Sequence, residues 1–368
     1  MDLYPYDDIT VNGRVILIHD ILSHNCAEAS PFEATLFGFV RQWFDGLTEF
    51  QLHTSGSTGA PKPISITRQQ MRASARLSAK VLDLRSGAHA LVCLDPAYIA
   101  GKMMLVRSFE LGLHIHFIDP VSNPLASIDE MPIDFCAMVP MQAFTVLRSP
   151  HAKKLHSDAT LIIGGGVIDQ QSHDLLQNLP CSCYATYGMT ETISHVALRK
   201  LNGRGASPHF TTMPGVEVTL DDRGCLVIHW EILHHDVVTN DMATLIDKRS
   251  FIWTGRWDNV INSGGYKVVP EAVERVLTDL FKELNVTNRF FIGSVADAIL
   301  ENKVALFIEG PIANELMLQV SQRLREMVSR YEVPRTILFR SRFVETQTGK
   351  INRIATMNLT SSDGDLSV

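Results

Sequence analysis

The stretch from Leu161 to Glu191, LIIGGGVIDQQSHDLLQNLPCSCYATYGMTE, indicates the fold more directly than any other part of this chain. An apolar run at 161–163 enters a glycine triplet, a helical pattern covers 169–179, and a second apolar run covers 183–187. Short apolar strands that alternate with helices are typical of a parallel sheet covered on both faces. Because such sheets bind ligands beyond the carboxyl ends of their strands, we expect both glycine-containing turns to border a site.

The same pattern of strands and turns extends to both sides of this stretch. Further strands are expected at 90–94, 113–118 and 135–139, and the runs at 216–220 and 225–228 flank the polar turn of a hairpin. The chain is therefore predicted to have an α/β fold, with mostly parallel sheets flanked by helices and with a β-hairpin region.

A small α+β domain is expected toward the C-terminal end. A helix begins at Pro270, and strands at 290–293 and 304–308, a helix at 314–330 and a strand at 336–339 follow it. We place the domain boundary near Trp257-Asp258. This gives a larger first domain at 1–257 and a mobile second domain at 258–368, joined by a hinge.

Composition and charge exclude several classes of protein. The 368 residues are 45% apolar, which suits a globular protein, and the net charge of -7 predicts no general attraction to nucleic acid or anionic membranes. The most apolar region, 89–118, is interrupted by Asp95, Lys102 and Arg107, so no membrane-spanning helix is expected. The six cysteines are scattered and the start lacks a signal-peptide pattern, so we expect reduced thiols and a cytoplasmic location.

The segment 54–62, TSGSTGAPK, is suited to binding a polyphosphate. Its turn can offer backbone N–H groups, hydroxyl donors and one cation, while the spacing of its glycines excludes a Walker A loop. The alternative is an ordinary solvated turn rich in glycine and serine. The candidate phosphate-binding residues are Thr54, Ser55, Gly56, Ser57, Thr58, Gly59 and Lys62.

A second candidate site lies at the end of the 183–187 strand. The Tyr187 ring can stack on a purine, Gly188 lets a ligand approach the backbone, and Glu191 can bind Mg²⁺. A strand followed by the capped start of a helix is the alternative interpretation. Taken alone, the triplet Gly164-Gly165-Gly166 is a flexible turn between a strand and a helix.

Three later segments complete the pattern: Thr239-Asn240-Asp241, GRWDNVINSGG at 255–265, and QTGKINR at 347–353. Together with the two sites above, and in this order along the chain, they resemble the adenylate-forming acyl- and aryl-CoA ligases, also called AMP-binding enzymes. The resemblance spans residues 53–353. It implies that the chain binds a small carboxylic acid, ATP, Mg²⁺ and coenzyme A.

The resemblance implies a role for each matching residue of the first domain. The 54–62 segment would hold the β- and γ-phosphates, and the backbone of Gly164, Gly165 and Gly166 would line the adenine and acyl pockets. Tyr187 would pack on adenine, Thr190 would contact the α-phosphate, and Glu191 would hold Mg²⁺.

The later matches imply roles in ribose binding, domain movement and catalysis. Asp241 would accept hydrogen bonds from the ribose, which Arg256 would also contact, and Asp258 would be the hinge residue. Gly265 would leave room for the pantetheine chain of coenzyme A. Lys350 would bind the substrate carboxylate and the α-phosphate during adenylation.

The sequence departs from the family pattern in three places. The phosphate segment begins near residue 54, where family members commonly carry a further N-terminal subdomain, so we expect a shortened first domain. Asn240 stands where glycine is usual in the ribose-binding segment. Val344-Glu345 replaces the usual proline ahead of the catalytic lysine.

The motif YGMTET, followed by Ser194-His195, resembles that of the o-succinylbenzoate–CoA ligases of menaquinone synthesis. o-Succinylbenzoate carries two carboxylates, so its unreactive end needs a hydrogen-bond donor. The candidates are Lys102, Arg107, His195 and Arg199. Lys102 and Arg107 lie in an apolar stretch, where a charge needs a function, and Lys102 is preferred. The alternative is that both side chains extend to the surface. The alternatives are a ligase for another aryl or fatty acid, a ligase that loads a carrier protein, and a nucleotide-binding relative without turnover.

Overall fold

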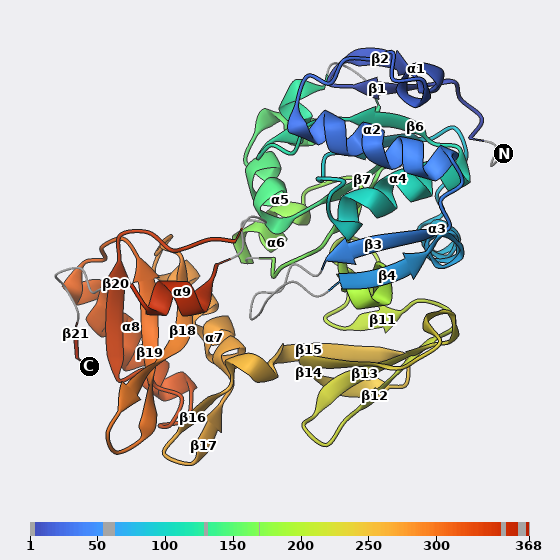
Figure 1. The fold of residues 1–368 in the computed structure, drawn as a ribbon. Coiled ribbons are helices and arrows are strands. Elements are labelled where there is room, and N and C mark those ends of the chain that lie inside the picture. The colour runs from blue at the N-terminus through green and yellow to red at the C-terminus, as the bar shows by residue number, and fades with distance from the viewer. Residues whose placement is uncertain are drawn as a thin grey trace. The chain divides into compact units, whose positions relative to one another are not determined.

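The computed structural model describes residues 4–53, 63–128, 132–168, 170–346, 351–359 and 366–367. The chain forms two compact units (Figure 1). The first unit runs to residue 218 and includes 228–237 and 246–251, and the second unit holds 219–227, 238–245 and the chain from 252 onward. The predicted division after Trp257 stays a prediction.

A large sheet organises the first unit, with strand order β2-β1-β6-β5-β7-β8-β9-β10-β11-β15, and the residues of β15 from 252 onward belong to the second unit. Its bounds are β1 Asp8–Val11, β2 Arg14–Leu17, β5 His89–Val92, β6 His114–Phe117, β7 Phe135–Met138, β8 Thr160–Ile163, β9 Ser182–Gly188, β10 His195–Lys200, β11 Phe210–Thr212 and β15 Ser250–Arg256. The pairs from β1/β6 through β8/β9 are parallel, whereas β10, β11 and β15 add antiparallel strands. The predicted mostly parallel sheet is therefore confirmed.

Strands β12 Val216–Leu220, β13 Cys225–Trp230 and β14 Val237–Asp247 follow β15 in the strand order, and their residues are divided between the two units. The polar turn between β12 and β13 is closed by hydrogen bonds from Asp221 N to Cys225 O at 2.9 Å and from Gly224 N to Asp221 O at 2.9 Å. The turn was predicted from its polar residues and its glycine.

Helices connect the parallel strands of the first unit: α1 Ile18–Leu22, α2 Pro31–Phe44, α3 Arg68–Leu82, α4 Ile99–Leu111, α5 Pro140–Leu147 and α6 Gln170–Leu176. Helix α3 begins with a capping box between Thr67 and Gln70, and α4 ends at Gly112 in the left-handed conformation. Every residue from Met103 to Phe109 is buried, so α4 is an internal helix and the apolar region 89–118 folds as strand, helix and strand. In the described part of the chain, no helix combines the length and apolar character needed to cross a membrane.

Helix α6 is shorter than predicted. The sequence pattern extended to 179, whereas α6 ends at Leu176, and a bond from Leu179 N to Leu176 O at 3.1 Å closes a tighter turn. The difference has a local cause, because Pro180 disfavours a helical conformation of the residue before it.

The second unit is built on a six-stranded sheet of order β17-β16-β19-β20-β21, with β18 paired to β19. Its elements are β16 Ile261–Ser263, β17 Tyr266–Val268, α7 Pro270–Glu283, β18 Phe290–Asp297, β19 Glu301–Glu309, α8 Asn314–Met327, β20 Thr336–Arg340, α9 Arg353–Met357 and β21 Leu366–Ser367. Helices α7 and α8 pack beside this sheet (Figure 1), and they contribute Val273, Leu277, Val320 and Leu324 to its core. The order of helices and strands matches the predicted α+β domain.

Candidate functional site

The glycine triplet follows β8, and Tyr187-Gly188 ends the neighbouring parallel strand β9. The two turns therefore share the carboxyl edge of the sheet, as predicted. Gly164 N donates to Met138 O at 3.1 Å, and a Cβ on Gly164 would lie 2.2 Å from Thr186 Oγ1. A side chain at Gly164 would thus displace the Thr186 hydroxyl, and Gly165, with φ +83°, is required by its backbone conformation.

The turn after Tyr187 is fixed by close backbone packing. A Cβ on Gly188 would lie 2.2 Å from Ser194 O, so only glycine fits between β9 and the start of β10. The buried Thr192 accepts a hydrogen bond from Met189 N at 2.9 Å, and Ile193 adopts a φ of +68°, which is rare for a β-branched residue. Such strain is found where a turn must hold one shape.

This turn presents Glu191 to solvent and leaves Thr190 half-buried. Within the described residues Glu191 has no ion-pair partner, so its carboxylate is available to a hard cation. Over the same residues, no group of three or more His, Cys, Asp or Glu side chains is placed to hold a metal ion.

Aromatic side chains brace the ring of Tyr187. The ring meets Phe251 edge to face, with centroids 5.1 Å apart, and contacts Phe210 at 5.9 Å. Phe251 is fully buried and stacks on Phe210. The Arg199 guanidinium lies over the Phe210 ring, 5.3 Å from its centroid. Burial lowers the pKa of Arg199. Edge-to-face contacts fix a ring plane, so Tyr187 has a defined orientation at the end of β9.

In the second unit, Asp241, Arg256 and Asp258 lie together. Asp241 is buried on β14 and accepts from Trp253 Nε1 at 3.2 Å, and its carboxylate is 3.8 Å from Arg256 Nη1. Arg256 Nη2 also pairs with Asp258 at 2.7 Å. The structure therefore places both predicted ribose-binding residues beside the predicted hinge residue.

The unusual Asn240 beside Asp241 has a structural partner. Its Oδ1 accepts from Arg223 Nη1 at 2.8 Å, and Arg223 Nη2 donates to Thr239 O at 2.9 Å. Because Arg223 binds this part of β14 through a side chain that glycine lacks, the asparagine is compatible with the position of Asp241.

The segment predicted to pass the pantetheine chain is the hairpin turn between β16 and β17. Gly265 has a φ of +83°, and no heavy atom lies within 4 Å of a Cβ placed on it. A hollow of about 50 Å³ borders the turn at Gly264 and Tyr266. The turn therefore has both the conformation and the open space for which glycine was expected.

Arg107 is a buried cation without a carboxylate partner among the described residues. It projects from α4 with 2% exposure, and Nη2 donates to Ser194 Oγ at 2.6 Å and contacts His195 Nδ1 at 3.3 Å. Its Nε has no hydrogen-bond partner within the described ranges. Burial alone lowers the pKa of Arg107 to about 10. A buried charge usually has a counterion, so the missing anion makes Arg107 a candidate ligand for a substrate carboxylate.

Lys102 is placed differently from Arg107. Its ammonium donates to the carbonyl oxygens of Pro96 and Ala97 and lies 5.6 Å from the centroid of the Phe39 ring. Burial lowers the pKa of Lys102 to about 8. Because its donors are already engaged with backbone oxygens, Lys102 is a weaker candidate for a substrate carboxylate than Arg107.

Two predicted elements lie outside the described residues: the phosphate segment from Thr54 to Lys62, and Lys350. The strands that flank the first, β3 Glu49–His53 and β4 Pro63–Thr67, pair antiparallel with His53 opposite Pro63. At the second, Glu345 bridges to Ile351 and Asn352 N donates to Val344 O at 2.7 Å. Regular strand pairing therefore flanks the first segment, and a single isolated bridge flanks the second.

Arg353, three residues beyond Lys350, anchors the end of that segment and received no role from the sequence. Its Nη2 pairs at 2.9 Å with Glu274 on α7, and the second oxygen of Glu274 accepts from Ile292 N at 2.8 Å. Burial raises the pKa of Glu274, against the opposing effect of Arg353. The only signal for this role in the sequence is the position of Arg353 at the end of the QTGKINR motif.

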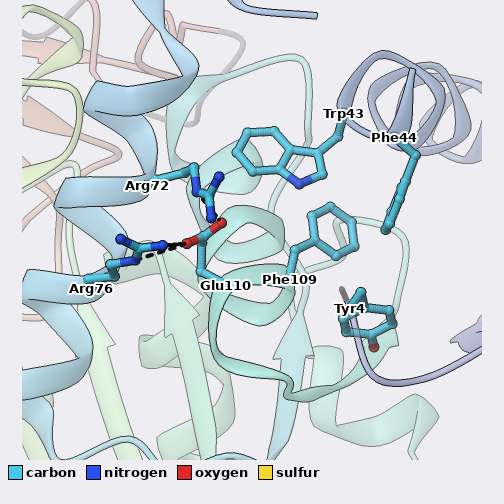
Figure 2. A pocket seen from close by; sticks show the side chains of 7 residues that line it. All are labelled: Tyr4, Trp43, Phe44, Arg72, Arg76, Phe109 and Glu110. Carbon is cyan, nitrogen blue, oxygen red and sulfur yellow. Dashed lines mark hydrogen bonds and ion pairs between the residues drawn. The ribbon is translucent and has the colours of Figure 1, made fainter. Parts of the chain in front are cut away.

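A separate cavity of about 90 Å³ contains none of the predicted residues (Figure 2). Its lining combines aromatic rings with a charged group: Tyr4, Trp43, Phe44, Arg72, Arg76, Phe109 and Glu110. The buried Glu110 carboxylate pairs with Arg72 at 2.7 Å and with Arg76 at 3.1 Å, as Figure 2 shows. Since its buried charge is already satisfied, this cavity is not a competing candidate site.

The sequence model of one protein family, the AMP-binding enzymes, matches residues 50–231. The solved acyl-CoA synthetase (AMP-forming)/AMP-acid ligase II-like protein from Dyadobacter fermentans is 40% identical, with a TM-score of 0.60, over 91% of this chain and 96% of that one. A 2-succinylbenzoate–CoA ligase from Lactococcus lactis is 24% identical over 82% of this chain and 69% of the relative. The match to a ligase of the same name from Salmonella typhimurium covers 50% of the length of that relative.

The fold is also that of the Bacillus subtilis o-succinylbenzoate coenzyme A synthetase solved with ATP and a magnesium ion. That structure is 18% identical with a TM-score of 0.68, over 84% of this chain and 69% of that one. The family model and a solved relative that is 40% identical over nearly the whole of both chains indicate the same family. The chain belongs to the AMP-binding enzyme family.

Proposed function

We propose that this chain joins a carboxylic acid to coenzyme A in two steps, through an acyl adenylate made from ATP in the presence of Mg²⁺. The observation that carries the proposal is the turn after β9. There a braced Tyr187, a sterically required Gly188 and Glu191, which has no ion-pair partner among the described residues, lie at the carboxyl edge of the sheet, in a chain of the AMP-binding enzyme family.

In the first step a carboxylate oxygen of the acid attacks the α-phosphorus of ATP, and pyrophosphate leaves with the electrons of the broken P–O bond. Catalysis of such a step is positioning and charge neutralisation. Tyr187 would orient the adenine, Thr190 the α-phosphate, and Asp241 and Arg256 the ribose. The 54–62 segment, Glu191 with Mg²⁺, and Lys350 would offset the negative charge.

In the second step the thiol of coenzyme A attacks the acyl carbon. The bond to the bridging oxygen breaks, AMP leaves with that oxygen, and the thiol proton is released. Between the two steps, the second domain would rotate about Asp258. This rotation would withdraw Lys350 and present the Gly265 turn to the pantetheine chain. These ligands are cytoplasmic metabolites, so we place the reaction in the cytoplasm.

The acid we propose is o-succinylbenzoate, which would place the reaction in menaquinone synthesis. The support is the name shared by the curated relatives, together with the chemistry of Arg107. A second carboxylate on the acid would supply the anion that this buried guanidinium lacks among the described residues. Arg107 therefore replaces Lys102 as our candidate for binding the unreactive carboxylate.

A panel of acids in a pyrophosphate-release assay tests this proposal. With ATP, Mg²⁺ and coenzyme A, we expect release to be fastest with o-succinylbenzoate and slow with benzoate and with medium-chain fatty acids. Faster turnover of a fatty acid would reassign the substrate, and turnover only with an acyl-carrier protein would reassign the acceptor. No pyrophosphate with any acid would favour a nucleotide-binding protein without turnover.

The variant Lys350→Ala separates the two half-reactions. We expect it to slow acyl-adenylate formation by several orders of magnitude, yet to change thioester formation from a synthetic acyl adenylate by less than about tenfold. Equal slowing of both half-reactions would contradict the role proposed for Lys350.

A further inference from the structure

A chain of hydrogen bonds links three elements around Arg107, and its proton donors can be assigned. Arginine only donates, so the contact of Arg107 Nη2 with His195 Nδ1 at 3.3 Å requires an unprotonated Nδ1. Ser78 Oγ donates to Ser74 O at 2.9 Å, which leaves its oxygen to accept from His195 Nε2 at 3.1 Å. The chain of donors therefore runs from α4 through β10 to α3.

The three side chains that these hydrogen bonds join are buried: Arg107 is 2% exposed, His195 6% and Ser78 0%. The imidazole must be neutral to accept from the arginine, and burial next to that cation disfavours a second positive charge. His195 thus holds the guanidinium without adding or removing charge at the site. An aspartate or glutamate could make the same contact, but it would neutralise the cation.

We propose that His195 is a positioning residue that orients Arg107 as a neutral acceptor, so that the guanidinium keeps its full charge for the second carboxylate of the acid. The inference rests on the proposed function, and it assigns to His195 a role different from direct contact with the substrate. Ser78 in turn fixes the tautomer and ring plane of His195, as outer partners of a ligand histidine often do.

The test compares two variants of equal shape and different charge, His195→Asn and His195→Asp. The readout is a selectivity ratio: kcat/KM for o-succinylbenzoate divided by kcat/KM for the better of two monocarboxylate analogues, 3-benzoylpropanoate and 2-butanoylbenzoate. Using both analogues also reveals which carboxylate is activated. We expect His195→Asn to keep the ratio within about threefold, and His195→Asp to lower it at least about tenfold, which is the loss of one charge-assisted contact.

Two buried serines give a matched control. Ser78 and Ser108 each donate at 2.9 Å to the carbonyl oxygen four residues earlier in a helix, but only Ser78 contacts His195. Ser78→Ala should lower the selectivity ratio by about threefold, whereas Ser108→Ala should leave it unchanged. Equal ratios for the two serine variants, or for the two His195 variants, would overturn the positioning role.

Failure of the proposed function gives a different result. If wild type shows no preference for the dicarboxylate, the substrate assignment fails. If wild type prefers it and Arg107→Met abolishes the preference while His195→Asp retains it, only the role of His195 fails.

A spectroscopic measurement keeps the inference testable if the variants fold poorly. Nitrogen-15 NMR of wild type with labelled histidine should show one imidazole that is protonated on Nε2, carries no proton on Nδ1, and does not titrate between pH 6 and 8. This imidazole should be missing from the spectrum of His195→Asn. The opposite tautomer, or a positively charged ring at pH 7, would overturn the assignment.

Discussion

Replacing Arg107 with methionine should remove selectivity for a dicarboxylate without the large loss of stability that usually follows the truncation of a buried side chain. Methionine fills a similar volume and leaves no charge in the core. The expectation follows from the missing carboxylate: no described residue offers Arg107 an ion pair. A cation stored in the core for a ligand lowers the stability of the free protein.

The size of the effect follows from the environment of the guanidinium. Burial lowers the pKa of Arg107 from 12.5 to about 10, which corresponds to about 3 kcal/mol against the charged form. Its contacts with Ser194 and His195 offset this by about 1 kcal/mol each. We therefore expect the free energy of unfolding of Arg107→Met to rise by about 1 kcal/mol, whereas truncating one partner of a satisfied buried ion pair costs about 3–5 kcal/mol.

Urea unfolding of both proteins, with and without o-succinylbenzoate, measures the difference. The ligand should raise the unfolding midpoint of wild type but not that of Arg107→Met. Arg107→Lys is the control, because it keeps a buried charge and should be less stable than the methionine variant. A loss of more than about 3 kcal/mol in Arg107→Met would show that the guanidinium already has a stabilising partner.

Three other changes test separate parts of the structure. Gly188→Ala should lower the free energy of unfolding by about 2–3 kcal/mol and abolish adenylation, because the added Cβ would lie 2.2 Å from a backbone oxygen. The control is Gly38→Ala, inside α2 with open space around its Cβ, which should leave the free energy of unfolding unchanged or raise it in the same urea titration. Burial lowers the pKa of His116 to about 4, so the unfolded chain binds the extra proton and stability should fall by up to about 1.4 kcal/mol for each pH unit from 6.5 toward 4. His116→Gln should flatten that slope, measured as unfolding midpoints between pH 7.5 and 5. Arg353→Met should cost about 3 kcal/mol because Glu274 is left buried without its cation, and the double variant with Glu274→Met should recover most of the loss in a double-mutant cycle.

Much of the architecture could be predicted from the sequence because local patterns determine it. The strands at 161–163 and 183–187 are indicated by their apolar runs, and the turns after them by their glycines, of which Gly188 is required by the close packing of β9 against the backbone of Ser194. Helix α6 shows the limit of such patterns. The apolar periodicity predicts a helix to residue 179, but α6 ends at Leu176, because the following Pro180 disfavours a helical conformation before it.

The candidate site was less predictable where a role depends on the hydrogen-bond and ion-pair partners of a charged side chain. Lys102 and Arg107 look equivalent in the sequence, and only the fold shows that Lys102 is bound by backbone oxygens while Arg107 lacks a carboxylate among the described residues. The Arg223–Asn240 contact likewise joins residues that are distant in sequence, so the departure at Asn240 could not be explained from the motif alone. Pairings of this kind depend on tertiary packing and leave no periodic signal.

The proposed reaction activates the acid as a mixed anhydride with AMP. The most direct measurement uses o-succinylbenzoate labelled with oxygen-18 in its carboxylates, together with ATP, Mg²⁺ and coenzyme A, and mass spectrometry of the nucleotide product. Because the bridging oxygen of an acyl adenylate comes from the acid and leaves on the phosphate, we expect AMP that carries one oxygen-18 atom for each thioester formed. Unlabelled AMP, or labelled inorganic phosphate accompanied by ADP, would contradict it.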